Sequence, residues 1–509
     1  MLLGVDVGTT SLKVAAYAPE RGRVVAVARR PTRAHRPRPG WAEFAPDEMW
    51  AETVTAIREV VQAVDPAAIE GIAIGSMGES GVMLDQHLEP LGPMIAWYDR
   101  RTEEQVTWWR SVLDPWAIYQ ITGLILDAKF SVNHLLWLRR HEPERFAAAR
   151  HWLCVPDFLA WKLCGQQATD HSIASRTMLL DQRRLDWSTD LLARADLPRS
   201  LLPPAVAAGT RVGGVTPRAA AETGLPRDAA VVTGGHDHLV GALGAGVVRS
   251  GSVLDSTGTA AVLLQLTEAF APKRALFEAG LETYAFVRPR TRVVLGAINL
   301  VGGAVDWLVR LLWGDGPRAN AHAFAAAEAA PRGSAGSLWL PHLLGSGTPH
   351  ADAASRAAVV GLRPEHERGH LLRGLLEGLA YWLRQNLDVA VEHAGLPADG
   401  DIVAIGGATR SPFWTQLKAD VCRRVYRVPE LEESVALGAA LLAGLGAGVF
   451  SDTRQAIASV RAEGHTFTPD EAASDAYDRW YRQAYLKLYP ALREINATLE
   501  ALAQSPPWT

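Results

Sequence analysis

The chain has 509 residues, a length that suggests two large domains. Hydrophobic residues make up 48% and charged residues 21%, which is a globular composition and excludes a disordered or fibrous class. The formal net charge is −4 and no block of like charge occurs, so we expect no nucleic-acid surface, which would need a basic stripe.

The cysteines and the first residues of the chain bear on the compartment. Cys154, Cys164 and Cys422 form no CxxC pair, so a disulfide framework is not expected and a reducing compartment fits. The opening MLLGVDVGTT is typical of a strand and not of a signal peptide. No run of about 18 apolar residues occurs, which predicts no transmembrane helix. We therefore expect a cytoplasmic protein that does not bind membranes.

The first half of the chain is expected to open with short apolar strands around a tight turn and then to become mostly helical. Helix 46–64 is indicated by its periodicity and by acidic residues in its first turn. The expected elements are strands 2–7, 12–18 and 23–29, helix 46–64, strands 71–76 and 82–85, and helices within 99–180.

The second half repeats the opening pattern. LLGVDVGTTSLKVAAY and SVLDSTGTAAVLLQL share a strand, a Gly-Thr turn and a second strand, which predicts two halves of similar architecture. We expect a first domain over 1–245, a second over 246–470 and a helical tail over 471–509. The expected elements are strand 229–235, a turn at 236–238, a small-residue helix from 239, two strands within 252–266, helix 302–314, strand 336–340, helix 366–395, strand 401–407, and helices 411–424, 433–447 and 471–503.

The first Gly-Thr turn could bind phosphate. Gly8, Thr9, Thr10 and Ser11 offer backbone N–H groups and hydroxyls, which suit phosphate oxygens. Asp6 beside a phosphate would be repelled unless a cation lay between them, so Asp6 is a candidate Mg²⁺ ligand. An ordinary hairpin with a polar turn is the structural alternative.

Two later turns repeat this chemistry. Gly258 and Thr259 lie in the second strand–turn–strand unit, and Gly406, Gly407 and Ala408 follow an apolar strand and open a helix. Together the turns could hold one polyphosphate between two domains, although plain turns remain the alternative. No GK[ST] or GxGxxG sequence occurs, so P-loop and dinucleotide sites lose support.

An aspartate follows the strand that ends in Gly234-Gly235. Transfer of phosphate to a hydroxyl needs a group that takes the alcohol proton, and the Asp237 carboxylate could do so. A helix N-cap is the structural alternative. His236 and His238 flank it, but an HxH pair without a third ligand nearby is weak for zinc.

Polar and aromatic residues at two strand ends of the first half suit a polyhydroxylated ligand. Aromatic faces, carboxylates and an arginine can all contact sugar hydroxyls and rings, while a core tryptophan with a surface ion pair is the alternative. The candidates are Met77, Gly78, Glu79, Trp97, Asp99 and Arg100.

These motifs, taken in order, resemble the FGGY family of carbohydrate kinases along nearly the whole chain. GVDVGTTSLKV looks like the family's first phosphate loop, TGGHDHLVGALGAG its catalytic-aspartate segment, STGTAAV its second phosphate loop and AIGGATRSPFWTQLKAD its adenosine segment. AVVGLRPEHERGHLLRGLLEG is close to the C-terminal family signature, from which it departs at Gly374, where Ala or Ser is usual.

The resemblance implies an α/β, actin-like ATPase fold, in which two domains, each with a five-stranded sheet, close over ATP. It implies that Asp237 is the general base and also lies at the metal, that Asp6 helps to hold Mg²⁺, and that His236 adjoins the substrate. Positions matching nucleotide contacts of relatives are Thr10, Thr259, Gly303 and Gly407; positions matching substrate contacts are Met77, Gly78 and Glu79. Relatives are often dimers, which suggests a homodimer by analogy.

The implied activity is ATP-dependent phosphorylation of a small sugar or polyol. A ketose kinase of the xylulose type is favoured, with fuculose, ribulose, erythritol, glycerol or gluconate as alternatives. Met77-Gly78-Glu79 departs from the xylulose pattern, Gly235-His236-Asp237 is similar to fuculose kinases, and the WYDRR run resembles the xylulose and gluconate branches. An alternative of another class is an actin-like ATP-binding regulator without sugar chemistry.

Overall fold

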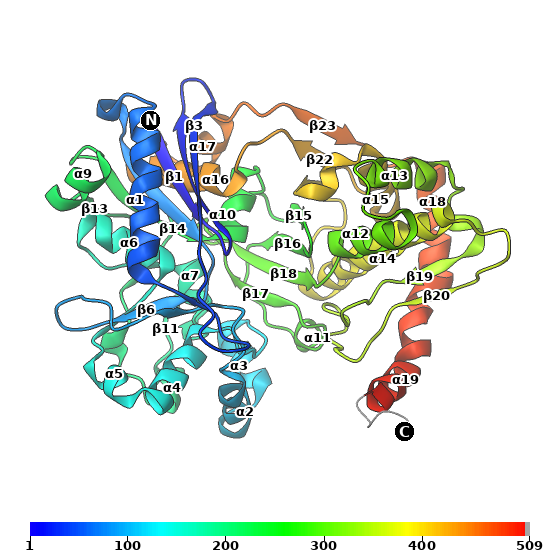
Figure 1. Ribbon diagram of the computed structural model, residues 1–509, viewed down its shortest axis with the longest axis horizontal. Helices are drawn as coiled ribbons and strands as arrows, with labels where there is room; N and C mark the ends of the chain where they lie inside the picture. Colours follow the sequence, from blue (N-terminus) through cyan, green and yellow to red (C-terminus); the bar gives the residue numbers. More distant parts are fainter. Residues whose placement is uncertain (504–509) are drawn as a thin grey trace.

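The computed structural model describes residues 1–503 and divides into two lobes, each built on one large mixed sheet (Figure 1). The strands are β1 Leu2–Val7, β2 Ser11–Ala18, β3 Arg23–Pro31, β4 Glu43–Phe44, β5 Gly71–Ser76, β6 Gly81–Leu84, β7 Met94–Ile95, β8 His151–Cys154, β9 Thr169–Asp170, β10 Leu180–Asp181, β11 Asp186–Trp187, β12 Ala205–Val206, β13 Arg211–Gly214, β14 Ala230–His236, β15 Val253–Thr257, β16 Ala261–Thr267, β17 Glu282–Ala285, β18 Arg292–Ile298, β19 Leu338–Leu340, β20 Ala358–Val360, β21 Ile402–Ile405, β22 Tyr426–Pro429 and β23 Gly464–Phe467.

Helices cover both sheets (Figure 1). They are α1 Pro46–Gln62, α2 Glu103–Val112, α3 Pro115–Thr122, α4 Ser131–His141, α5 Pro143–Ala148, α6 Val155–Cys164, α7 His171–Ser175, α8 Thr189–Ala195, α9 Pro217–Thr223, α10 Asp237–Gly244, α11 Arg274–Glu278, α12 Gly302–Trp313, α13 Ala319–Ala329, α14 Arg368–Ala394, α15 Pro412–Cys422, α16 Ser434–Gly446, α17 Thr453–Ala458, α18 Glu471–Trp480 and α19 Leu486–Ala503.

The first sheet has the strand order β13-β14-β5-β1-β2-β3. β14, β5 and β1 run parallel, so their carboxyl ends lie at one edge of the sheet. These strands are buried on both faces, which is why their sequences are largely apolar, with polar residues mainly toward their carboxyl ends. Side chains alternate between faces: Leu3 and Val5 of β1 pack with α1 and α6, whereas Leu2 packs with α16 on the opposite face.

The second sheet repeats this plan, with the order β17-β18-β16-β15-β21-β22-β23. As in the first sheet, a hairpin (β15–β16) is followed along the sheet by parallel strands, here β21 and β22. The sheets contain six and seven strands instead of the five expected, because β13 extends the edge of the first and β17 and β23 extend both edges of the second.

Most expected elements are present, but one expected turn is wrong and several strands and helices, β22 and β23 among them, were not expected. The expected turn at 236–238 is wrong, because His236 ends β14 and Asp237 is the first residue of α10, so strand passes directly into helix. β17 and β18 were not expected, although both strands are almost wholly buried. Within the expected tail, α18 and α19 are joined by a π-helical turn, Tyr481–Tyr485, and residues 504–509 lie outside the described chain.

Helix α16 links the two lobes. It follows β22 of the second sheet in the sequence, yet it packs against β1, β5 and β14 of the first sheet and against α10. The packing is close enough to require glycine: a Cβ at Gly4 would lie 1.7 Å from the Ala436 carbonyl oxygen, and one at Gly438 2.0 Å from that of Val240. In space, therefore, the division of the chain is less simple than a single break near residue 245.

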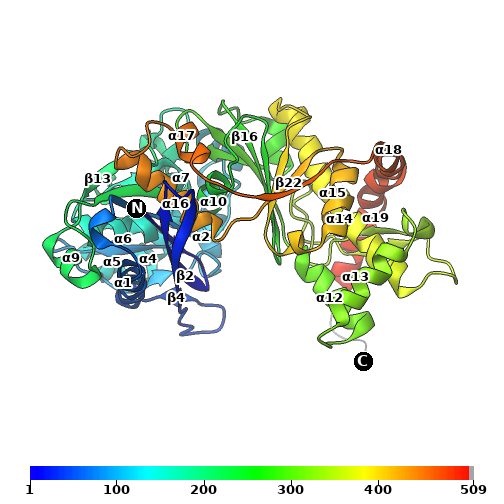
Figure 2. The ribbon, with the colours of Figure 1, turned by 90° about the horizontal axis from the view of Figure 1, so that it is seen from above.

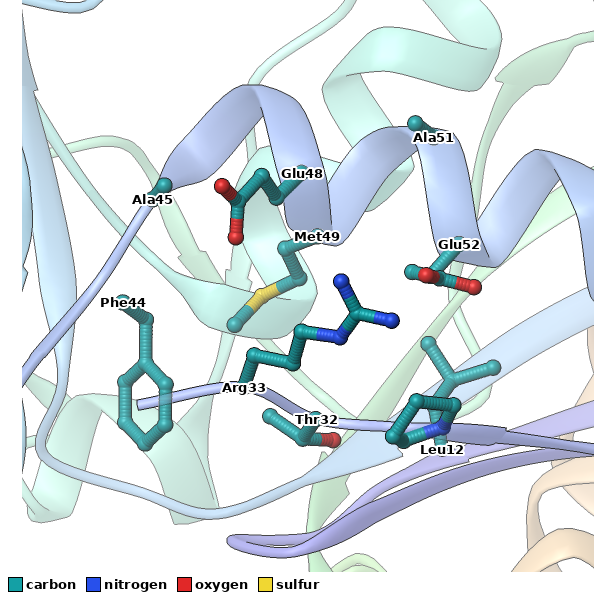
Figure 3. Close-up of a pocket in the computed structure, with 10 residues that line it drawn as sticks. Leu12, Thr32, Arg33, Phe44, Ala45, Glu48, Met49, Ala51 and Glu52 are labelled. Atoms are coloured by element: carbon teal, nitrogen blue, oxygen red, sulfur yellow. The ribbon is translucent and has the colours of Figure 1, made fainter. Parts of the chain in front are cut away.

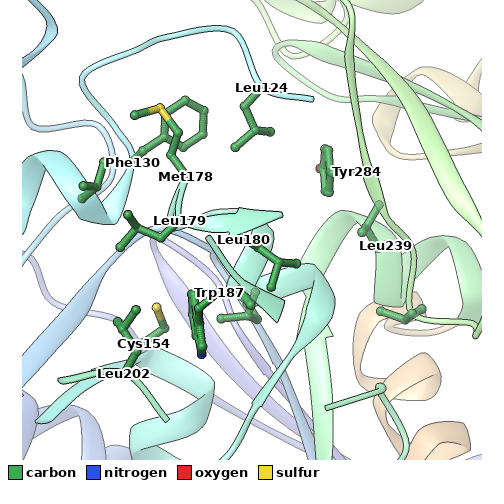
Figure 4. Close-up of a cluster of buried hydrophobic side chains, with 14 of the residues drawn as sticks. Leu124, Phe130, Cys154, Met178, Leu179, Leu180, Trp187, Leu202, Leu239 and Tyr284 are labelled. Carbon is green, nitrogen blue, oxygen red and sulfur yellow. The ribbon is translucent and has the colours of Figure 1, made fainter. Parts of the chain in front are cut away.

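An apolar cluster joins the lobes at a second place. Leu124, Phe130 and Met178 of the helical region pack in one cluster with Leu239 of α10 and Tyr284 of β17 (Figure 4). At the same contact, the backbone N–H of Thr283 donates to the carbonyl oxygen of Gly123 over 2.8 Å.

Among residues 1–503, no helix is both long and apolar enough to cross a bilayer.

Candidate active site

A cavity of about 490 Å³ lies between the lobes, where the carboxyl ends of parallel strands from both sheets meet. Its first-lobe wall contains Asp6, which lies at the end of β1, and Asp237, which directly follows β14. Its second-lobe wall contains Ser256 of β15 and Gly406, the residue after β21. The cavity thus unites residues of four motifs that are far apart in the sequence.

Asp6 occupies a buried position in this cavity. The Lys13 ammonium lies 3.3 Å from its Oδ2, and Lys13 in turn pairs with Glu433, just before α16, at 2.8 Å. Burial, together with the negative charge of Asp237, raises the pKa of Asp6 to about 7, although Lys13 opposes the shift. Two carboxylates thus approach one another beside a single partly exposed lysine.

Asp237 lies at the N-terminus of α10, and its carboxylate faces the same cavity. Its Oδ1 accepts a hydrogen bond of 2.6 Å from the backbone N–H of His238, which uses one donor of the helix N-terminus. Burial raises the pKa of Asp237 above its ordinary value, while His238 opposes that shift. Its side chain is still 24% exposed, so an incoming hydroxyl can reach it.

His236 is buried behind the aspartate. Its backbone N–H donates to Ser172 Oγ at 2.9 Å, its Nδ1 lies 3.3 Å from Tyr284 Oη, and its Nε2 lies 3.4 Å from Asp237 Oδ1. Burial and the charge of Arg176 lower the pKa of His236 well below its ordinary value, so the ring is neutral at pH 7. With no third ligand grouped with the two histidines in residues 1–503, the arrangement gives no support to a zinc site.

Glu79 belongs to a buried network of ion pairs. The Arg176 guanidinium donates from Nε to Glu79 Oε1 at 2.9 Å and from Nη1 to Glu282 Oε2 at 2.6 Å, and Lys129 lies 3.6 Å from Glu282. Burial alone would raise the pKa of Glu79, but the charges of Arg176 and Lys129 hold it below its ordinary value. Because Glu282 lies on β17, the network crosses from one lobe to the other.

Met77 and Gly78 lie directly after β5, beside this network. Met77 is buried in the apolar core of the first lobe. Gly78 lies against Arg176 and His236: a Cβ there would be 2.8 Å from Arg176 Cγ and 3.3 Å from His236 Cδ2. Glycine at 78 therefore leaves space that the Arg176 side chain takes.

The WYDRR residues are arranged differently from one another. Trp97 is 37% exposed, and its Nε1 donates to Thr9 Oγ1 at 3.0 Å, which ties it to the first Gly-Thr turn. Asp99 is buried, and its carboxylate accepts from the backbone N–H of Ala42 and from Arg101. Arg100 is exposed and pairs with Glu103 and Asp127. Asp99 is thus occupied by its ion pair with Arg101 inside the first lobe. Arg100 does not line the cavity that contains Asp237.

The two Gly-Thr turns are closed by similar backbone hydrogen bonds. The Gly8 N–H donates to the Ser11 carbonyl at 3.0 Å, and the Gly258 N–H donates to the Ala260 carbonyl at 2.9 Å. Ser11, like Gly8, lines the cavity between the lobes. Thr10 is exposed at the tip of the first turn, and its carbonyl accepts from the N–H of Thr32.

The second turn opens into a separate cavity of about 870 Å³ in the second lobe. Gly258 and Thr259 form part of its wall, opposite Gly407 and Ala408, while Gly406 lines the neighbouring cavity between the lobes. The remaining lining includes Phe324 of α13, Phe413 and Trp414 of α15, and Arg410. Apolar rings with a few polar groups suit a flat heterocyclic ligand.

The N-terminus of α12 closes onto the second turn. The N–H of Gly303 donates to the Thr259 carbonyl at 3.2 Å, and a Cβ at Gly303 would lie 3.1 Å from Thr259 Cγ2. Gly303 therefore supports the turn through its backbone. Behind the turn, Lys418 Nζ donates to Asp255 Oδ2 at 2.8 Å and to Thr257 Oγ1 at 3.0 Å, which fixes the end of β15.

A third cavity, of about 180 Å³, lies between α1 and the chain that follows β3. Its walls contain Leu12, Phe44 and Met49, with Arg33 lying between Glu48 and Glu52 (Figure 3). None of the residues predicted to bind a ligand lines it.

Sequence reasoning missed the charged residues that hold the site together. Lys13 lies in β2, two residues after the first turn. Whether its side chain meets Asp6 depends on how β1 and β2 are paired, which the sequence does not state. Arg176 and Glu282 lie in segments without a motif, and their partners are about a hundred residues away or more. Only the fold brings these charges together.

The chain is similar to known proteins over nearly its whole length. The model of the FGGY family of carbohydrate kinases, N-terminal domain, matches residues 1–244, and that of the C-terminal domain matches residues 254–447. Xylulose kinase of Bacillus subtilis (strain 168) is 28% identical over 508 residues, covering 99% of each chain. Glycerol kinase of Thermococcus kodakarensis is 31% identical over 496 residues, covering 95% of this chain and 96% of that protein.

Solved structures agree with this similarity. The crystal structure of xylulose kinase from Rhodospirillum rubrum matches with a TM-score of 0.90 and 31% identity, covering 97% of this chain and 99% of that one. The expected two-domain, actin-like ATPase fold is therefore confirmed. With the two family models spanning most of its length, the chain belongs to the FGGY family of carbohydrate kinases.

Proposed function

We propose that this ATP-dependent sugar kinase phosphorylates a hydroxyl of a neutral ketose, with a ketopentose of the xylulose type favoured. The observation that carries the proposal is the position of Asp237, whose carboxylate faces the cavity between the lobes and lies beside the buried Glu79–Arg176–Glu282 network. Full-length similarity to xylulose kinases supports the choice of sugar.

The charges near Asp237 favour an uncharged substrate. Glu79 and Glu282 are matched by Arg176 and Lys129, so the network carries no net charge, and Asp237 adds one negative charge beside it. A sugar acid would bring a further carboxylate into this buried region without a free cation to pair with it, which is costly. Gluconate is therefore less favoured than fuculose, ribulose, erythritol or glycerol among the alternatives.

In the proposed mechanism, the sugar hydroxyl donates its hydrogen bond to Asp237. The carboxylate takes the alcohol proton as the hydroxyl oxygen attacks the terminal phosphorus of ATP. The bond from that phosphorus to the bridging oxygen breaks, ADP leaves, and the phosphorylated sugar remains with the proton on Asp237. The turns at 8–11 and 406–409 border the cavity, where their backbone groups could hold phosphate oxygens.

The residues at the cavity fit a magnesium ion. Asp6 is buried and Asp237 is partly exposed; their mutual repulsion contributes to the raised pKa of Asp6, and a cation between them would relieve it. Mg²⁺ takes many of its ligands from water and phosphate, so it can be held with only one or two protein carboxylates. When bound, it would neutralise charge on the phosphate oxygens.

The test is a coupled ADP-release assay with MgATP over xylulose, ribulose, fuculose, rhamnulose, gluconate, glycerol, erythritol and pentitols. We expect strong turnover with one neutral sugar and little with gluconate. Preferred turnover of gluconate would overturn the charge argument, and preferred turnover of glycerol would overturn the choice of a ketose.

Two further expectations stay predictions. Light scattering coupled to size-exclusion chromatography tests the homodimer suggested by analogy. A cytoplasmic location fits the use of ATP and the three free, buried cysteines, and cell fractionation tests it.

A further inference from the structure

Arg176 is a buried cation that the sequence motifs do not include. It follows α7, and its side chain is only 5% exposed, yet it contacts carboxylates from both lobes. The ring of Tyr284 lies 5.2 Å from its guanidinium carbon, and that of Phe130 lies 5.1 Å away on another element. Two ion pairs and two aromatic rings thus fix the direction of this side chain.

The position of Arg176 depends on glycine at 78. Its Cγ occupies the space that any side chain at 78 would need, since a Cβ there would lie 2.8 Å away. Gly78 also adjoins the His236 ring, and His236 immediately precedes the proposed base. Arg176 therefore brings a guanidinium close enough to Asp237 for its charge to act on that carboxylate, at a place where Gly78 supplies no side chain of its own.

The ion pairs leave hydrogen-bonding capacity on both partners. Both bonds from Arg176 to Glu79 end on Oε1, so Oε2 is left for other donors. Nη1 donates to Glu282 and Nη2 to Glu79, but each of these nitrogens carries a second N–H. A pair that offers an acceptor and a donor side by side matches two adjacent hydroxyls, of which one donates and the other accepts.

We propose that Arg176 is a specificity-determining residue of the sugar site, which together with Glu79 recognises a vicinal diol of a neutral sugar. Glu282, from β17 of the second lobe, holds the guanidinium in the required direction, so the nucleotide-binding lobe helps to shape the sugar site. This inference rests on the proposed function, because it concerns the substrate of the same reaction.

The experiment compares R176K with wild type in steady-state assays on the best neutral sugar. Lysine keeps the charge but cannot bridge two carboxylates and still donate to a hydroxyl. We expect KM for the sugar to rise by about 10- to 100-fold, the usual scale for a lost hydrogen bond to a charged group, with KM for ATP unchanged. An unchanged KM for the sugar would overturn the inference.

A matched control separates recognition from support of the fold. Arg292 is also buried between the lobes, where its guanidinium donates to the carbonyl of Gln182, but it does not contact Glu79. R292K should lower thermal stability and leave KM for the sugar as in wild type. If R176K behaves like R292K, Arg176 is structural and the inference fails.

Monodeoxy analogues of the sugar give a second readout. For the analogue that lacks the hydroxyl bound by Arg176, wild type and R176K should have the same KM. For the other analogues, KM should remain higher in R176K than in wild type. If KM is higher in R176K for every analogue, the inference is overturned. If R176K does not fold, R176Q/E282Q, which removes the cation with one partner, allows the same comparison. A wild type that phosphorylates no neutral sugar would overturn the proposed function itself.

Discussion

At the scale of single residues, Asp6 and Asp237 face one cavity with different surroundings. Asp6 is paired with Lys13, whereas Asp237 accepts from the N-terminus of α10 and remains partly exposed. This difference suits two roles: Asp237 can meet a hydroxyl, while Asp6, close to the first Gly-Thr turn, can contact a phosphate-bound cation.

Replacing the base should remove turnover but not binding. We expect D237N to lower kcat by about 10²- to 10⁴-fold, the usual scale for loss of a general base, with KM for the sugar little changed. ADP release measures kcat, and D190N, which alters an exposed carboxylate paired with Arg194, serves as the control. Near-normal turnover by D237N would remove Asp237 from this role.

The ionisation of Asp237 should set the acidic limb of the pH profile. A base acts only when deprotonated, so activity falls as the pH drops through its pKa. Because burial raises the pKa of Asp237, kcat/KM should begin to fall at a pH above the ordinary 3.8 of an aspartate. A profile flat down to that value would argue against a buried base.

Asp6 should govern the magnesium requirement. In D6N the carboxylate that would help to hold the ion is replaced by a neutral amide, a weaker ligand for a hard cation. The Mg²⁺ concentration for half-maximal activity should therefore rise, while activity at saturating Mg²⁺ should partly recover. A titration of D6N that overlays the wild type would contradict the assignment.

At the scale of elements, the crossing of α10 and α16 positions the site. α10 begins with Asp237, and α16 begins directly after Glu433, the partner of Lys13. The helices approach so closely that each needs glycine against the other's backbone: a Cβ at Gly244 would lie 2.0 Å from the Ser434 carbonyl oxygen. Small changes at this contact should therefore shift the carboxylates of both Asp237 and Glu433.

A methyl group at this contact should disturb both stability and activity. We expect G438A to cost about 1–3 kcal/mol, the usual scale for overpacking a core, and to lower kcat because α10 must shift. Thermal unfolding and the coupled assay measure the two effects. G316A is the matched control, because a Cβ there meets nothing within 4 Å. Equal melting temperatures for both variants would contradict the argument.

Local sequence predicted the hairpins and most helices because their signals are local. Each Gly-Thr turn lies between two short, mostly apolar strands, and α1 and α14 have clear periodicity. The strand β17 gave no such signal, because Glu282 and Thr283 are buried by tertiary contacts and not by an apolar pattern. The turn predicted at 236–238 was wrong, because the two glycines before it favoured a turn that the sheet does not need.

The candidate site was predicted only in part, for a related reason. Asp237 and the first Gly-Thr turn are marked by short motifs, and the parallel strands bring them to one cavity. Arg176 has no motif, since its role depends on partners 97 and 106 residues away. Charges paired across a fold cannot be found from spacing along the chain.

At the scale of the whole molecule, the lobes share apolar core. Tyr284 of the second sheet belongs to the same buried cluster as Phe130 and Leu180 of the first lobe (Figure 4). Leu264 of the second sheet is a further member of this cluster. We therefore expect one calorimetric unfolding transition, because neither lobe can unfold without exposing the core of the other. Two resolved transitions, one of which shifts with ATP, would contradict this expectation.

The course of the chain between the lobes has a consequence for how the protein can be divided. It passes from α10 into β15, returns from β22 to α16, and leaves again from α17 to β23 (Figure 2). A fragment ending near residue 245 would lack α16 and leave one face of β1, β5 and β14 uncovered. The gene therefore offers no point at which one cut yields two self-sufficient halves, and separately made pieces would have to fold around each other.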